Sequence, residues 1–136
     1  MWFHSLYAAG YDALLQLYIH VPDVSDDMKP EWGTVIYRVP FEGGGHGYTY
    51  QTPYISKVPT KWSPRGDHMF KEYDSEVVGY CHCHPNPTFF SSSDTSFVES
   101  NSTVAFMCNQ KGGYWYDATD LSIPKQSRYG KFWGKY

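Results

Sequence analysis

The chain has 136 residues, 41% of them apolar, which suits one domain with a buried core and leaves little room for two. Charged residues make up 18% and the formal net charge is −3, so composition argues against a nucleic-acid-binding surface and against a strongly charged, disordered chain. No stretch approaches the about 18 consecutive apolar residues that span a bilayer, and we recognise no secretion signal. We therefore expect no nucleic acid and no membrane among the partners.

The first predicted element is an amphipathic helix over residues 5–17, where apolar side chains recur every three or four positions and Ser5 is the expected cap. Gly10 is an unfavourable residue inside this helix. An irregular connection with two prolines follows over residues 21–30.

Two strands are predicted next, over residues 32–39 and 48–52, because both stretches are rich in β-branched and aromatic residues. The glycine cluster at residues 43–47 joins them as an antiparallel hairpin. Three prolines then indicate a surface excursion over residues 53–66, and residues 68–73 are expected to form a short helix.

The second half of the chain alternates strands with one helix. Residues 76–84 form a predicted strand, a helix begins near residue 91, and residues 103–108 and 114–118 form a second hairpin. This order predicts an α+β fold with a mixed, mostly antiparallel sheet flanked by helices.

A pair of histidines at the end of the third predicted strand indicates a metal site. Side chains alternate along a strand, so His82 and His84 share one face while Cys81 and Cys83 point to the other. A catalytic zinc takes three protein ligands and a water, and the following loop and helix start offer Asp94 as the third ligand. The sequence therefore predicts that His82, His84 and Asp94 bind Zn²⁺.

The same segment reads His82-Cys-His84-Pro85, a short spacer, then Ser91-Ser-Ser-Asp94. It resembles the JAB/MPN (JAMM) metalloprotease signature, His-x-His-Pro followed by Ser-x-x-Asp. The resemblance covers about residues 31–118, within a single domain of residues 1–136 whose first 30 residues form the helix and its connection. It implies a cytidine-deaminase-like JAB/MPN fold, zinc held by the two histidines and Asp94, and Ser91 as oxyanion donor.

The resemblance also implies an upstream glutamate that acts as general base at the start of an early strand. Glu31 matches that position, whereas Glu42 follows the strand and is a weaker candidate. The spacer before Ser91 is one residue shorter than in the eukaryotic deubiquitinases of this family, which leaves Ser91 and Ser92 both open as the oxyanion donor.

The resemblance implies a zinc metallopeptidase or isopeptidase that hydrolyses amide bonds in a protein or peptide, including conjugates of ubiquitin-like modifiers. The amino-acid sequence of the motif looks closest to that of JAB-like domains of bacterial toxins and secretion effectors. That likeness adds delivery into a target cell, and an immunity or carrier protein as partner, to the expectations.

Two other interpretations stay open. The chain is either a non-catalytic MPN-type interaction module, or a domain whose zinc is purely structural. The three cysteines, Cys81, Cys83 and Cys108, are expected to be free thiols in a reducing compartment, which favours the cytoplasm.

Overall fold

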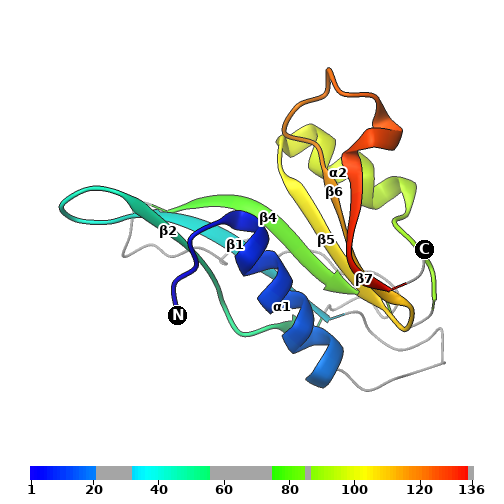
Figure 1. Ribbon diagram of the computed structural model, residues 1–136, viewed down its shortest axis with the longest axis horizontal. Helices are drawn as coiled ribbons and strands as arrows, with labels where there is room; N and C mark the ends of the chain where they lie inside the picture. The colour runs from blue at the N-terminus through cyan, green and yellow to red at the C-terminus, as the bar shows by residue number, and fades with distance from the viewer. Residues whose placement is uncertain (21–31, 56–74, 85–86, 135–136) are drawn as a thin grey trace.

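The computed structural model describes residues 1–20, 32–55, 75–84 and 87–134 (Figure 1). The expected connection at residues 21–30, the excursion beyond residue 55 and the helix at residues 68–73 lie outside these ranges. The elements in chain order are α1 (Leu6–His20), β1 (Trp32–Pro40), β2 (His46–Tyr50), β3 (Tyr54–Ile55), β4 (Glu76–Cys83), α2 (Ser92–Asn101), β5 (Val104–Asn109), β6 (Gly112–Asp117), the 3-10 turn η1 (Lys125–Arg128) and β7 (Tyr129–Gly134). This confirms the predicted α+β class.

All described strands belong to one sheet, with the order β2-β1-β4-β5-β6-β7 and with β3 paired to β1. The β4–β5 pair is parallel and the other pairs are antiparallel, as expected for a mixed, mostly antiparallel sheet. Parallel neighbours need a crossover connection, and α2 lies within it. As a result β4, the strand that carries the histidines, has a hydrogen-bonded neighbour on both sides.

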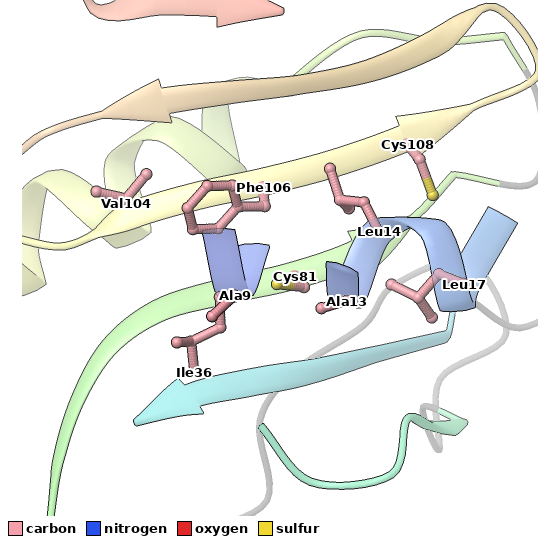
Figure 2. Packing of buried hydrophobic residues seen from close by; sticks show 9 residues of the cluster. All are labelled: Ala9, Ala13, Leu14, Leu17, Ile36, Cys81, Val104, Phe106 and Cys108. Atoms are coloured by element: carbon pink, nitrogen blue, oxygen red, sulfur yellow. The ribbon is translucent and has the colours of Figure 1, made fainter. Parts of the chain in front are cut away.

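Helix α1 covers one face of the sheet. Its cap is Ser5, whose Oγ accepts a hydrogen bond from the Ala8 N–H at 3.1 Å, as predicted. Four residues of α1 pack against five from β1, β4 and β5 in the main buried cluster of Figure 2: Ala9, Ala13, Leu14, Leu17, Ile36, Cys81, Val104, Phe106 and Cys108. Gly10 allows this approach, since a Cβ there would lie 2.5 Å from the Phe106 ring.

Helix α2 covers the opposite face. Ala105 and Phe106 are consecutive on β5, and Ala105 packs with Val98 of α2 whereas Phe106 packs with α1. Because consecutive strand residues point to opposite faces, the two helices lie on different sides of the sheet (Figure 1).

No element was predicted beyond residue 118, so strand β7 is an unexpected part of the sheet. Glycine weakens strand propensity, and β7 contains Gly130 and Gly134. Gly130 is required by a contact with the facing strand, because a Cβ at that position would lie 2.1 Å from the Trp115 ring. The predicted second strand was also displaced, since β2 begins at His46 rather than Tyr48.

Cys81, Cys83 and Cys108 are free thiols, as expected. Within the described ranges, no helix is long and apolar enough to cross a membrane.

Candidate metal centre

The two histidines are positioned by the ladder of β4. His82 pairs with Gly33 of β1 and with Met107 of β5, and the His84 N–H donates to the Cys108 carbonyl at 2.9 Å. Cys81 belongs to the α1 cluster on the other face, which confirms that the cysteines point away from the histidines. The backbone of His82 is therefore paired on both sides, and that of His84 is bonded to β5.

Asp94 is positioned by the N-terminus of α2. Ser91 is the N-cap, and its Oγ accepts a hydrogen bond from the Asp94 N–H at 3.1 Å. In return the Ser91 N–H donates to Asp94 Oδ2 at 2.8 Å, which completes a capping box. The helix that the sequence predicted to begin near residue 91 is therefore capped by Ser91. The box also fixes the rotamer that carries the Asp94 carboxylate toward β4.

The three predicted ligands converge. Asp94 Oδ2 lies 3.5 Å from His82 Nε2 and 3.4 Å from His84 Nε2, and the two Nε2 atoms lie 2.7 Å apart. One ligand atom from each residue falls within 4.8 Å of the others. Two ligand atoms of a tetrahedral zinc with bonds of about 2.0–2.1 Å lie roughly 3.3 Å apart. The two distances from Asp94 Oδ2 to the histidine nitrogens match this value. The two Nε2 atoms would need to move apart by about 0.6 Å to bind the same ion.

Burial and charge at the triad also suit a cation. His82 and His84 are 6% and 7% exposed, and Asp94 is partly buried. Burial opposes ionisation of Asp94, but hydrogen bonds from His82 and the Ser91 N–H outweigh it and hold the pKa of this carboxyl well below its usual range. Asp94 is thus a carboxylate at neutral pH, the form that binds metal. Two imidazoles with one carboxylate bind zinc in hydrolases and iron(II) in oxygenases.

Thr88 was not predicted as part of this centre. His84 Nδ1 lies 2.9 Å from Thr88 Oγ1 and 3.1 Å from the Thr88 carbonyl oxygen. Thr88 belongs to the short spacer, which is anchored by the next two residues: the Phe89 ring packs on Tyr114, and the Phe90 ring packs on Tyr129. No periodicity in the sequence signals such a contact, because it depends on where β6 and β7 lie.

The glutamate candidates have different outcomes. Glu31 lies outside the described residues. Its neighbour Trp32 begins β1 and pairs with Cys83, so β1 starts beside the histidine-bearing end of β4. Glu42 follows the other end of β1, roughly 25 Å farther along at the rise of an extended strand, and is not brought to the centre.

A pocket of about 570 Å³ opens elsewhere, beside α1 and β2. Its walls include Asp12 and Gln16 of α1, Trp32 of β1 and Tyr50 of β2. Tyr50 pairs with Ile36, a member of the α1 cluster, so the pocket lies on the face of the sheet opposite the histidines. The metal centre does not open into it.

Comparison of the sequence with models of known protein families and with curated proteins returned no match. Functional assignment therefore depends on the geometry of the triad and on the spacing of its residues.

Proposed function

We propose that the chain is a zinc-dependent metallopeptidase or isopeptidase with a JAB/MPN (JAMM) domain. The observation that carries the proposal is the convergence of His82, His84 and Asp94, which come from a strand and a helix and place three ligand atoms within 4.8 Å. Three ligands, two imidazoles and one carboxylate, match the donor set of catalytic zinc sites, which keep one position for water.

In this proposal His82, His84 and Asp94 hold the zinc. When bound, zinc supplies a Lewis acid that polarises the scissile carbonyl and lowers the pKa of a bound water to about 7. The capping box keeps the Asp94 carboxylate oriented through the Ser91 N–H. Hydrogen bonds to metal ligands of this kind preserve their geometry and their basicity.

Ser91 is the proposed oxyanion donor. Its side chain is exposed to solvent at the N-terminus of α2, three residues before Asp94. The oxygen accepts the Asp94 N–H, and a serine hydroxyl that accepts a hydrogen bond can still donate its own hydrogen. A substrate oxyanion beside the metal would therefore meet an O–H donor and the positive end of a helix.

Glu31 is the proposed general base, which takes the proton of the attacking water and returns it to the departing amine. The register of the sheet supports this choice, because β1 begins at Trp32 opposite Cys83, the residue between the two histidines. The proposed substrates are proteins or peptides, including conjugates of ubiquitin-like modifiers. Action in the cytoplasm, or in a target cell as an effector with an immunity or carrier protein, belongs to the same proposal.

Metal analysis and hydrolysis assays on three variants test this function. The wild type is expected to bind one zinc per chain in preference to iron, and to cleave a bond in a panel of di-ubiquitins and peptides. Asp94→Ala is expected to lose zinc, and Glu31→Gln to keep zinc but lose cleavage. Glu42→Gln is the matched control and is expected to keep both.

Each alternative gives a different result. A non-catalytic interaction module would cleave nothing in the panel, and Glu31→Gln would not differ from the wild type. A structural zinc would bind, but its chelation would unfold the protein. A wild type that takes up no zinc after supplementation contradicts the proposal directly.

A further inference from the structure

Asn109 is a buried polar residue that lies behind the metal centre. It ends β5 and is 2% exposed. Its Nδ2 donates to the Thr88 carbonyl oxygen at 2.8 Å, and the same oxygen lies 3.1 Å from His84 Nδ1. A chain of hydrogen bonds thus links Asn109 to a predicted zinc ligand through one backbone carbonyl.

We propose that Asn109 is a positioning residue for the metal centre, which acts through the Thr88 carbonyl to fix the tautomer and the ring orientation of His84. The inference rests on the proposed zinc site, and it adds a residue that does not touch the metal. Asn109 would then contribute to the metal affinity of the site as well as to the stability of the β5–β6 turn.

The orientation of the Asn109 amide is determined by its partners. Its Oδ1 accepts two backbone hydrogen bonds from the β5–β6 turn, from Lys111 N–H at 2.7 Å and Gly112 N–H at 3.1 Å. An oxygen must face these two donors, so the NH₂ group must face Thr88. A flipped amide would place two donors against N–H groups and an oxygen against a carbonyl.

The tautomer of His84 follows from the same network. A carbonyl oxygen can only accept, so the 3.1 Å contact with the Thr88 carbonyl is a hydrogen bond when the proton of His84 is on Nδ1. The Thr88 hydroxyl, 2.9 Å from Nδ1, can accept the same hydrogen. The Nε2 atom then carries the lone pair, and it is Nε2 that faces Asp94 at 3.4 Å. Metal-ligating histidines commonly donate their other ring N–H in this way, and loss of such a partner typically lowers metal affinity by about 10- to 100-fold.

The Asn109→Asp variant separates the two tasks of the side chain. Aspartate is nearly isosteric and keeps an oxygen for the Lys111 and Gly112 N–H groups, but it replaces the donor to Thr88 with an acceptor. The Thr88 carbonyl would then face a carboxylate oxygen and shift away from His84. Asn109→Ala, which removes the donor without adding a charge, is the second variant if the carboxylate prevents folding.

Asn101→Asp is the matched control. The Asn101 Nδ2 also donates to a backbone carbonyl, that of Phe97 at 2.7 Å, but it lies at the C-terminal end of α2, away from the triad. The control variant therefore loses the same kind of hydrogen bond, from a side-chain amide to a backbone carbonyl, at a place that is not linked to His84.

Two readouts are measured on wild type, Asn109→Asp, Asn109→Ala and the control. The ring ¹⁵N chemical shifts of His84 in the metal-free protein are expected to report an Nδ1–H tautomer in wild type and control, and a mixture of tautomers in both Asn109 variants. Competition with a chromophoric chelator is expected to give a zinc dissociation constant about 10- to 100-fold higher for the Asn109 variants and unchanged for the control.

The outcomes distinguish this inference from the proposed function. An unchanged tautomer, or a zinc affinity in the folded Asn109 variants within threefold of wild type, overturns the role of Asn109 even if the protein is a zinc enzyme. Absence of zinc binding in the wild type contradicts the proposed function and, with it, the metal-affinity part of this inference.

Discussion

Ser91 has two tasks that a substitution can separate. Its hydroxyl caps α2, and in the proposed function it also donates to the oxyanion. Replacing a capping serine by glycine costs only a few tenths of a kcal/mol, whereas loss of an oxyanion donor lowers kcat by about 10²- to 10³-fold. Ser91→Gly is therefore expected to melt within a few degrees of wild type and to lose most of its hydrolysis.

Ser92→Ala decides between the two serines. Ser92 is the first residue of α2 and is exposed. Its hydroxyl is not part of the capping box, so the variant is expected to keep stability and activity. A large loss of kcat in Ser92→Ala with little loss in Ser91→Gly would transfer the donor role to Ser92.

At the scale of the element, the contact of α1 with the sheet depends on Gly10. A Cβ at this position would lie 2.5 Å from the ring of Phe106, which is fully buried. Helix propensity favours alanine over glycine by about 1 kcal/mol, but overpacking of a core costs about 1–3 kcal/mol. Gly10→Ala is expected to lower the free energy of unfolding, as measured by urea denaturation.

The companion variant tests the cause of that loss. Phe106→Leu removes the ring that meets the new methyl group, so Gly10→Ala should cost less in the Phe106→Leu background than in wild type. Equal costs in both backgrounds would assign the effect to the helix itself.

Two tyrosines tie α1 and β2 to neighbouring elements through carboxylates. The Tyr7 hydroxyl donates to Asp117 at the end of β6, and the Tyr50 hydroxyl donates to Asp12 of α1. Burial, and then the bond to Asp117 and its charge, raise the pKa of Tyr7 above its ordinary value; burial and Asp12 do the same for Tyr50. At neutral pH, Tyr7→Phe is expected to cost about 1–2 kcal/mol.

The raised pKa values give a direction for the pH dependence. A group whose pKa is higher in the folded state contributes stability that is complete below its unfolded value, near 10, and is lost as the pH rises toward the folded value. The melting temperature is expected to fall above about pH 10, and to fall less steeply in Tyr7→Phe/Tyr50→Phe. Tyr11→Phe is the control, because the exposed Tyr11 of α1 contacts Phe132 and Trp133 of β7 through its ring, which the substitution keeps.

At the scale of the whole molecule, the fold is expected to be independent of metal. The buried clusters that join α1 and α2 to the sheet are apolar, and none contains His82, His84 or Asp94. A ligand that binds only the folded state at about 100 times its Kd adds about 2.7 kcal/mol. Zinc is therefore expected to raise the melting temperature by about 10 °C, and chelation to reverse this rise without unfolding the protein at 25 °C.

Circular dichroism after chelation gives the check. A native far-ultraviolet spectrum in excess chelator supports a metal-independent fold. Loss of that spectrum at 25 °C would show that zinc stabilises the fold itself, as the structural-zinc interpretation requires.

Features that depend on local geometry could be predicted from the amino-acid sequence. Strand alternation placed His82 and His84 on one face, and the serines from residue 91 onward predicted the start of a helix. The Ser5 cap, the α+β class and the mixed sheet followed from periodicity and turn residues in the same way.

Contacts between residues far apart in the chain could not be predicted, because they depend on tertiary packing. The 3.4 Å approach of Asp94 to His84 depends on how α2 packs on β5, and the bond from Asn109 to Thr88 joins residues 21 positions apart. The same holds for the close approach of Gly10 to Phe106 and for the pairing of β7 with β6. These contacts leave no periodic pattern in the chain, because a long-range contact is determined by the packing of whole elements rather than by the residues beside it.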